Sequence, residues 1–212
     1  MELIKELLFP SRCVLCRRLL RDGDTDLCVS CRKDVPRVEK PISKISFLDS
    51  CVALWHYEDK VRSSLHRFKF RGKRCYASNY GRLLAMKLQQ TELPFDVLTW
   101  VPISRRRKWR RGYDQVEILA KSVGRELGVE AVCTLKRVRH APPQSGIFDP
   151  AKRRANVLGV YRAVEPEHFS GKRVLLLDDI VTTGATLSEC ARVLLTAGAL
   201  EVRGATVASA RK

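Results

Sequence analysis

The stretch from residue 173 to residue 186 constrains the fold more than any other part of the sequence. It reads RVLLLDDIVTTGAT, an apolar run that ends in the adjacent carboxylates Asp178 and Asp179 and continues into a small, hydroxyl-rich loop. A short apolar run between polar residues is typical of a strand that is buried on both faces, as in a parallel sheet covered by helices. In such sheets ligands bind at the carboxyl ends of the strands, so we expect the site there.

The chain beyond residue 45 alternates between strand and helix patterns. We expect strands over residues 51–57, 96–101, 133–138, 157–163, 173–177 and 202–208, and helices over residues 59–70, 77–90, 115–127 and 185–197. Near-continuous apolar strands between amphipathic helices predict an α/β fold with a parallel sheet and helices on both faces.

The loop after Asp179 has the composition of a phosphate-binding turn. A helix that begins there presents free backbone N–H groups to an anion, and Gly184 lets the backbone approach closely. The two carboxylates repel a phosphate and need hydroxyl groups or a metal beside it, and a phosphorylated ribose meets both demands. The alternative is an ordinary capped strand-to-helix turn. The predicted phosphate-loop residues are Val181, Thr182, Thr183, Gly184, Ala185 and Thr186.

Two CxxC pairs near the N-terminus predict a metal site. Cys13 and Cys16 form one pair, Cys28 and Cys31 the other, and eleven residues separate them. Such doublets in a cytosolic protein indicate metal or redox chemistry more than a disulfide framework. Four thiolates close a tetrahedral Zn²⁺ shell with no open position, so we expect a structural zinc ion that supplies folding free energy. A redox function would need a thioredoxin-like βαβ context, which this segment lacks.

We place a domain boundary near residue 45. Residues 35–46 carry Pro36, Pro41 and mixed charge without periodicity, which suits a linker. The chain is therefore expected to contain a zinc ribbon and linker over residues 1–45 and an α/β domain over residues 46–212.

The net charge of the chain indicates anionic partners. Forty Lys and Arg against 23 Asp and Glu give +17, and Arg outnumbers Lys by 26 to 14. Nucleic acid, phosphorylated metabolites and an anionic membrane face all fit this charge, and a solvated basic surface is the alternative. No apolar run approaches the roughly 18 residues of a membrane-spanning helix, so no membrane insertion is expected. The start, MELIKELLFP, is a poor secretory signal, which predicts a cytoplasmic protein.

The motif VLLLDDIVTTGAT resembles the phosphoribosyl pyrophosphate (PRPP) binding motif of type I phosphoribosyltransferases. Over nearly all 212 residues the sequence resembles the ComF family, the competence-associated, GntX-like phosphoribosyltransferase-like proteins with an N-terminal zinc ribbon. Besides the ribbon and the PRPP motif, the segments that carry this resemblance are LHRFKFRG (65–72), Val101-Pro102, RGYDQ (111–115), Gln144 and RRANV (153–157). Asp114 departs from the pattern, because Asn is commoner at that position.

The resemblance implies a type I phosphoribosyltransferase-like fold and PRPP binding with Mg²⁺. Asp178 and Asp179 would be the catalytic residues that hold the ribose. The implied pyrophosphate side comprises Pro102, Ile103, Ser104, Arg105 and Arg111, and the implied mobile loop contains Arg139, Gln144, Arg153 and Arg154. The chain would transfer or release the phosphoribosyl group, with no acceptor indicated by the sequence.

The resemblance also implies a function in DNA uptake during competence, with single-stranded DNA or a DNA-uptake helicase as the partner. The alternative to an enzyme is therefore a non-enzymatic single-stranded DNA-binding or adaptor protein. The basic run over residues 105–111 allows either interpretation, because it contains Trp109 among six basic residues. For Trp109 we favour a core position over a stacking one. The sequence does not indicate the oligomeric state.

Overall fold

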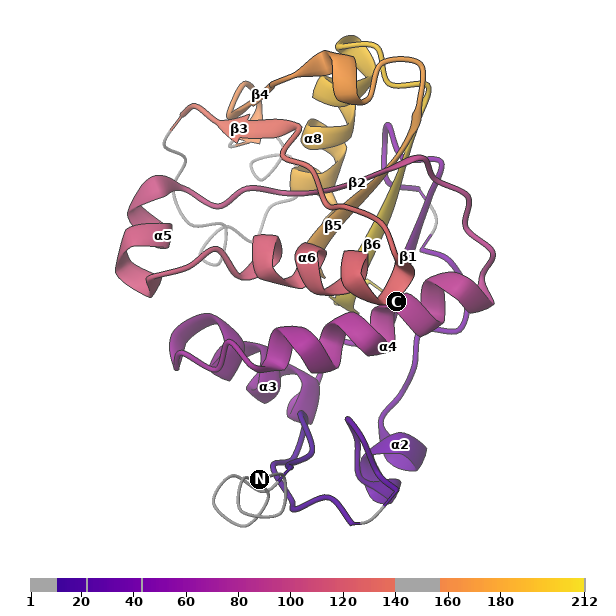
Figure 1. Cartoon of the computed structure of the whole chain (residues 1–212), viewed down its shortest axis with the longest axis vertical. Helices are drawn as coiled ribbons and strands as arrows, with labels where there is room; N and C mark the ends of the chain where they lie inside the picture. Colours follow the sequence, from indigo (N-terminus) through magenta and orange to yellow (C-terminus); the bar gives the residue numbers. More distant parts are fainter. Residues whose placement is uncertain (1–10, 22, 43, 140–156, 212) are drawn as a thin grey trace.

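The computed structural model describes residues 11–21, 23–42, 44–139 and 157–211. Its centre is a parallel sheet of four strands in the order β1-β6-β5-β2 (Figure 1). These strands are β1 (Ser50–His56), β2 (Val97–Trp100), β5 (Arg173–Val181) and β6 (Glu201–Ser209). All three strand pairs are parallel, as the sequence predicts.

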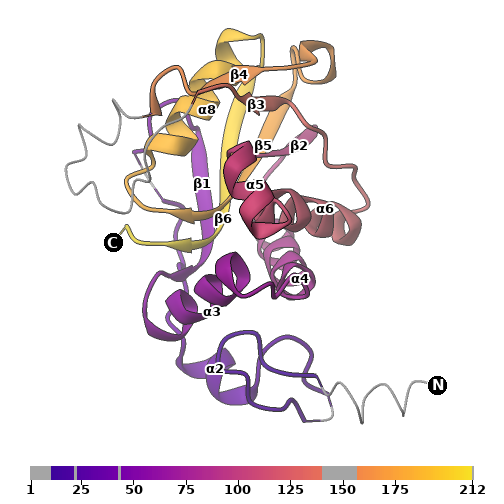
Figure 2. The ribbon, with the colours of Figure 1, turned by 90° about the vertical axis from the view of Figure 1, so that its left-hand side faces the viewer.

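Helices cover both faces of this sheet. Helices α4 (Tyr76–Gln90) and α6 (Gln115–Leu127) lie on one face, and α8 (Ala185–Thr196) lies on the other (Figure 2). Side chains of β5 alternate between the two layers: Leu175 and Leu177 pack with α4 and α6, while Val174 and Leu176 pack with α8. Within the described residues, none of the helices combines the length and apolar character needed to cross a membrane.

Three elements differ from the sequence-based expectations. Helix α5 (Arg105–Arg111) is absent from the expected helices. It forms because Ser104 caps its N-terminus, Gly112 ends it in a left-handed conformation and Arg and Lys favour helices. Strands β3 (Leu135–Arg137) and β4 (Tyr161–Ala163) form a separate antiparallel pair and do not extend the main sheet. Each is only three residues long and has one buried position, so neither suits a sheet covered on both faces.

Strand β5 also continues beyond its predicted end at Leu177. Pairing with β6 extends to Val181, so Asp178 and Asp179 belong to the strand and do not follow it. The remaining elements are α2 (Val29–Asp34), α3 (Asp59–Phe70) and a 3-10 turn (Pro166–His168).

The N-terminal cysteine-containing segment packs against α3 and α4 at the bottom of Figure 1. Val14, Leu15 and Leu27 belong to the same hydrophobic core as the layer formed by α4 and α6. The buried carboxylate of Asp26 accepts hydrogen bonds from Asn79 and Arg82 of α4. The N-terminal segment is therefore joined to the α/β layer by apolar and charged contacts.

The segment expected as a linker runs beside β1. Backbone hydrogen bonds join Val38 N to Leu54 O and His56 N to Pro36 O. Val35, Val38 and Ile45 are buried, so this segment contributes to the core instead of only connecting two parts.

We predict that Asp26→Ala destabilises the full chain by about 2 kcal/mol, because the change removes charge-assisted hydrogen bonds to α4. Urea denaturation of the zinc-loaded protein measures this change. Asp34→Ala is the matched control, since Asp34 is exposed and bonds only to Ser30 on its own helix among the described contacts. That control should lie within about 0.5 kcal/mol of the wild type. Equal losses in both variants would contradict the anchoring function of Asp26.

Candidate functional site

A polar cavity of about 170 Å³ lies at the carboxyl ends of β2 and β5. This is where an open parallel sheet normally binds its ligands. Four cationic side chains and two carboxylates line it: Lys69, Arg107, Arg111, Arg137, Asp178 and Asp179. The excess of positive charge favours an anionic ligand.

Asp179 is held by side chains from two helices. It is only 5% exposed, and its Oδ1 lies 2.8 Å from the Lys69 Nζ of α3. Its Oδ2 accepts a 2.9 Å hydrogen bond from the Gln115 Nε2 of α6, and Gln115 Oε1 in turn accepts a 2.7 Å bond from Arg111 Nη1. The Asp179 carboxylate is thus paired on both oxygens, as a buried charge requires.

Asp178 has a different environment from its neighbour. Successive side chains of a strand point to opposite faces, so Asp178 lies on the α8 side of the sheet. Burial and repulsion by Asp179 raise the pKa of Asp178 well above its ordinary value, against the opposing effect of Lys69 and of the Asp179 N–H. Among the described residues, only Oδ1 of this carboxylate accepts a hydrogen bond. Asp178 is therefore the carboxylate that is better placed to accept new hydroxyl donors.

Two arginines of α5 face the cavity one helical turn apart. Burial and repulsion from Arg137 lower the pKa of Arg107, and burial, with repulsion from Arg107, lowers the pKa of Arg111. The Arg111 guanidinium lies 4.7 Å from the centre of the Phe70 ring, and its buried Nε has no hydrogen-bond partner in the described part of the chain. An anion between these arginines would reduce their mutual repulsion and would accept a hydrogen bond from the unpaired Nε of Arg111.

Asp114 fixes the loop between β2 and α5 to the start of α6. Its Oδ1 accepts from Val116 N at 2.9 Å and Glu117 N at 3.2 Å, and its Oδ2 accepts from Ile103 N at 3.0 Å. Three N–H donors match a carboxylate, which accepts at both oxygens, better than they match an amide. The departure from Asn at this position therefore has a structural explanation.

The predicted phosphate loop connects β5 to α8. Gly184 has φ +84°, and a Cβ there would lie 3.0 Å from Ile45 Cγ1, so both conformation and space favour glycine. Arg211 donates from Nη1 to the Thr183 carbonyl at 2.8 Å and steadies the loop. A small hollow of about 20 Å³ opens between this loop and Asp178. The first amides of α8 lack intrahelical partners, as in any helix, and lie at this hollow.

The structure brings many predicted residues together. The main cavity is lined by Pro102, Ile103, Arg111, Asp178, Asp179 and Thr186. The hollow is lined by Val181, Thr182, Gly184, Ala185 and Thr186, and Thr183 Oγ1 accepts a 3.4 Å bond from Ala185 N. Ser104, Arg105 and Arg139 line a neighbouring basic depression instead. Gln144, Arg153 and Arg154 lie outside the described residues, so the expected mobile loop stays a prediction.

Among the polar residues that line the cavity, the site predicted from the sequence omits Lys69, Arg107, Gln115, Arg137 and Tyr161. Lys69 and Gln115 lie within LHRFKFRG and RGYDQ, so those motifs could have identified them. No motif marks Arg137 or Tyr161, which reach the cavity through the antiparallel pair β3–β4.

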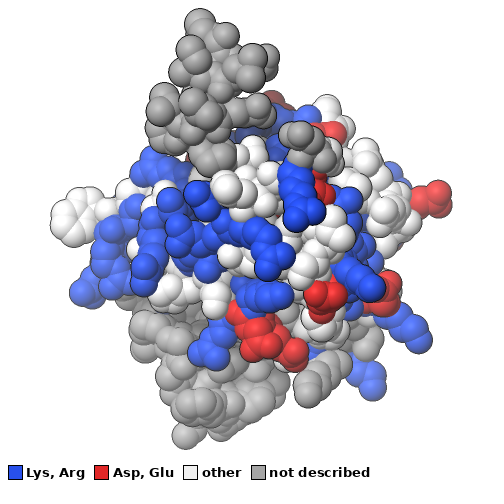
Figure 3. All heavy atoms as spheres, turned by 90° about the horizontal axis from the view of Figure 1, so that it is seen from below, with Lys and Arg blue, Asp and Glu red and all other residues white. Residues whose placement is uncertain are grey.

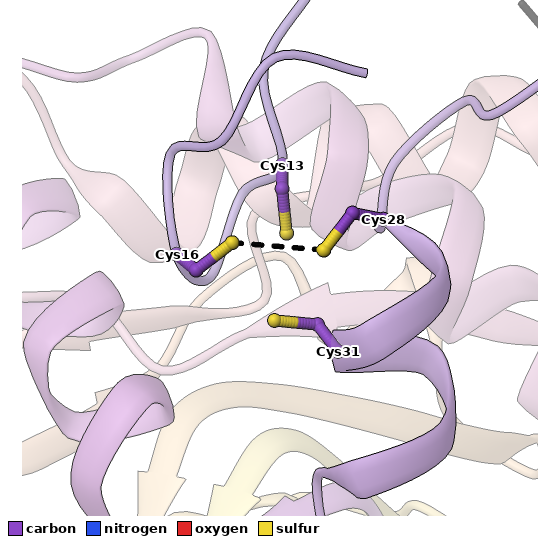
Figure 4. A group of neighbouring side chains, drawn as sticks. All are labelled: Cys13, Cys16, Cys28 and Cys31. Atoms are coloured by element: carbon purple, nitrogen blue, oxygen red, sulfur yellow. Dashed lines mark hydrogen bonds between the residues drawn. The ribbon is translucent and has the colours of Figure 1, made fainter. Parts of the chain in front are cut away.

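The four N-terminal cysteines form a second site (Figure 4). Their Sγ atoms all lie within 4.8 Å of one another, and the Cys16–Cys28 pair is 3.6 Å apart. A tetrahedral zinc site with Zn–S bonds of about 2.3 Å requires sulfur separations of about 3.8 Å, whereas a disulfide requires about 2.05 Å. Burial raises the pKa of Cys13, but N–H donors of Cys16, Cys28 and Leu15 outweigh it and lower that pKa to about 7, whereas burial raises the pKa of Cys16 and of Cys31, so the support for zinc comes from the sulfur geometry. The cluster therefore fits a closed, structural zinc ion.

Two family models match the chain. The phosphoribosyl transferase domain matches residues 116–212, and the double zinc ribbon domain matches residues 4–45. The first range contains β5, the predicted phosphate loop and α8, and the second contains all four clustered cysteines. These matches confirm the expected phosphoribosyltransferase-like fold and zinc ribbon.

Two relatives align along most of the chain. Competence protein F of Haemophilus influenzae is 30% identical over 220 residues, which cover 92% of this chain and 95% of that protein. DNA utilization protein YhgH of Escherichia coli is 27% identical over 90% of this chain and 87% of its own length. Among solved structures, glutamine phosphoribosylpyrophosphate amidotransferase from B. subtilis is 26% identical over 63% of this chain and 26% of its own, with a TM-score of 0.44.

We predict about one zinc ion per chain in the wild type and none in the double variant Cys28→Ser/Cys31→Ser. The double variant should also have a lower melting temperature, because the segment that carries Val14 and Leu15 belongs to the main core. Elemental analysis and calorimetry measure the two effects. Cys75→Ser is the control, since this exposed thiol lies outside the cluster. Full zinc content in the double variant would contradict the ligand assignment.

We predict opposite stability effects for Asp178→Asn and Asp179→Asn in the ligand-free protein at pH 7. The folded state raises the pKa of Asp178 above the ordinary 3.8, so ionisation costs stability as the pH rises from that value through the folded pKa. Asp178→Asn removes this cost and should raise the melting temperature by at least about 2–4 °C, the equivalent of roughly 1 kcal/mol. Asp179→Asn breaks the 2.8 Å pair with Lys69 and should lower it.

Thermal scans between pH 3 and pH 8 measure both effects. The gain from Asp178→Asn should vanish near pH 3, where this carboxyl is protonated in both states. A gain that persists unchanged at pH 3 would mean that packing, and not charge, explains the change.

Proposed function

The chain belongs to the Competence protein F family, and we propose that its cavity binds PRPP with Mg²⁺ as part of a function in DNA uptake. The relatives named as competence and DNA utilization proteins support a role in competence. The phosphoribosyl transferase match over residues 116–212 supports PRPP as the ligand. The enzymatic activity and the cytoplasmic location belong to the same proposal.

One observation carries the assignment: two cationic or N–H-rich regions flank a pair of carboxylates. The hollow at Thr182 to Thr186 suits a terminal phosphate, and the arginines Arg107 and Arg111 suit a more highly charged group. Between them, Asp178 has an oxygen that can accept from hydroxyl groups. PRPP has this order of groups: a 5-phosphate, two ribose hydroxyls and a pyrophosphate.

The proposed reaction is displacement at C1 of the ribose. A nucleophile forms a bond to C1 while the bond from C1 to the pyrophosphate oxygen breaks, and the bonding electron pair leaves with pyrophosphate. Mg²⁺, when bound, neutralises charge on the leaving pyrophosphate. Arg107 and Arg111 stabilise the same negative charge, and Asp178 and Asp179 stabilise the positive charge that develops on the ribose. With water as the nucleophile, the products are ribose 5-phosphate and pyrophosphate.

A second candidate function is binding of single-stranded DNA, favoured by the outer face of α5. Trp109 is 87% exposed, so the expectation of a core position is wrong. Its neighbours Arg106, Lys108 and Arg110 are also exposed. Figure 3 shows Lys and Arg side chains over much of one face of the molecule, with smaller acidic areas. An exposed aromatic ring among cations is suited to base stacking beside a phosphate backbone.

We predict that PRPP with Mg²⁺ binds the wild type, and that Asp178→Asn and Thr186→Val each weaken binding about ten- to a hundredfold, because each loses a polar partner of the ligand. Calorimetric titration measures this loss. Thr196→Val, a threonine exposed at the other end of α8, is the matched control and should bind as the wild type does. Absence of binding to the wild type at millimolar PRPP would contradict the proposal.

We predict that Trp109→Ala weakens binding of single-stranded DNA about fivefold or more without changing PRPP affinity, since stacking of one base contributes about 1–3 kcal/mol. Fluorescence anisotropy at two salt concentrations measures DNA binding, which should fall steeply as salt rises. Asp178→Asn is the opposite control, because it should weaken PRPP binding and leave DNA binding unchanged. Unchanged DNA affinity in Trp109→Ala would exclude α5 as the DNA contact.

A further inference from the structure

Helix α3 contacts the cysteine cluster through one of its faces. Arg67 Nη2 donates to the carbonyl of Leu15 at 2.6 Å and to that of Val14 at 3.4 Å, and Ser64 Oγ donates to the same Val14 carbonyl. Val14 and Leu15 are the two residues between Cys13 and Cys16. The helix is thus bonded to the backbone of the turn that presents one pair of metal ligands.

The same helix contacts the cavity through its C-terminal end. Lys69 Nζ lies 2.8 Å from Asp179 Oδ1, and the Phe68 carbonyl accepts a hydrogen bond from the Tyr113 hydroxyl. The Arg111 guanidinium lies over the Phe70 ring. Lys69 is two positions after Arg67, so the two side chains point to opposite sides of one helix. The cysteine turn and the cavity therefore share a single rigid element.

We propose that zinc binding at the cysteine cluster and ligand binding in the cavity are coupled through α3, with Arg67 as the positioning residue that keeps Lys69 on Asp179. The identity of the cavity ligand rests on the proposed function, whereas the link between the zinc and Lys69 does not. Lys69 is the group that contacts the carboxylate pair, and Arg67 acts through it.

The physical argument depends on how buried polar groups are satisfied. A bound zinc ion fixes the Cys13–Cys16 turn and hence the direction of the Val14 and Leu15 carbonyls, which are nearly inaccessible to solvent. When the turn relaxes without metal, the half-buried Arg67 guanidinium loses its two carbonyl acceptors and keeps only the bond from Nε to the Tyr76 hydroxyl, which favours a shift of Arg67 that restores the lost bonds. A helix moves as a unit, so a shift at Arg67 also moves Lys69 away from Asp179.

Loss of Lys69 from Asp179 alters the cavity directly. The pKa of Asp178 is held down in part by the charge of Lys69. Without this cation the carboxylate pair repels an anionic ligand more strongly. The coupling therefore has a definite sign: zinc strengthens anion binding in the cavity, and an anion in the cavity strengthens zinc binding.

Equilibrium coupling is reciprocal, which gives a test that does not depend on activity. Zinc affinity is measured by competition with a zinc-selective chromophoric chelator, with Mg²⁺ constant, in the presence and absence of saturating PRPP. We expect PRPP to tighten zinc binding about tenfold, and zinc-free protein to bind PRPP about tenfold more weakly. Coupling of this size lies in the usual range of roughly 5- to 150-fold.

Arg67→Met is the decisive variant, and Arg67→Lys is the second, since a lysine keeps the charge but loses the fork that contacts two carbonyls. Both should still bind one zinc ion, and PRPP should shift zinc affinity less than twofold in Arg67→Met. Arg62→Met is the matched control, because Arg62 is an exposed arginine of the same helix, and it should keep the full tenfold shift. A full shift in Arg67→Met overturns the proposal.

A ligand-free measurement separates this proposal from the proposed function. The ¹⁵N-detected ammonium signal of Lys69, assigned with Lys69→Met, reports its bond to Asp179 because hydrogen bonding slows proton exchange. We expect this signal in zinc-loaded wild type and Arg62→Met, and its loss in zinc-free wild type and Arg67→Met. If PRPP does not bind but the signal follows zinc, only the proposed ligand is wrong. If the signal is the same with and without zinc, the coupling is wrong.

Discussion

The pair formed by Lys69 and Asp179 is the contact on which the arrangement of the site depends. A carboxylate with 5% exposure is costly unless it is paired, and its two oxygens are paired by side chains from α3 and α6. Pairing both oxygens of Asp179 therefore brings the ends of α3, α6 and β5 together. The cavity lies at the point where these three elements meet. Because removing one partner leaves a buried charge, alternative arrangements of α3 against the sheet are penalised.

The other charged side chains of the cavity favour ligand binding more than they favour the stability of the free protein. Asp178 has a raised pKa because it is buried beside Asp179, and Arg107 and Arg111 have lowered pKa values because they are buried near one another or near Arg137. These charged groups lower the stability of the free protein. A ligand with anionic ends and hydroxyl groups between them would offset their mutual repulsion and the cost of their burial. Clusters of perturbed groups in one cavity are typical of functional sites, where stability is lower than the fold could otherwise reach.

Local sequence patterns predicted the main elements well where an element is long and its buried faces are well defined. The apolar run of β5 and the periodicity of α3, α4, α6 and α8 identified the central layers, because these elements are long and their faces are defined by burial. The same reasoning failed for α5, whose seven residues bury no side chain fully and so show no apolar period. It also failed for the pairing of β3 with β4, since three-residue strands contain too little pattern to indicate a partner.

The sequence by itself indicated the donor groups of the two sites, because each CxxC pair and the DDIVTTGAT loop place their groups within a few residues of one another. A turn or a strand-to-helix loop brings such residues together whatever the rest of the chain does. Only the tertiary structure decided that Arg137 and Tyr161 join the cavity, and that the two adjacent carboxylates have different partners. Asp179 faces Lys69 of α3 and Gln115 of α6, whereas Asp178 faces the α8 side. That difference arises from contacts between residues far apart in the chain, and local sequence carries no record of them.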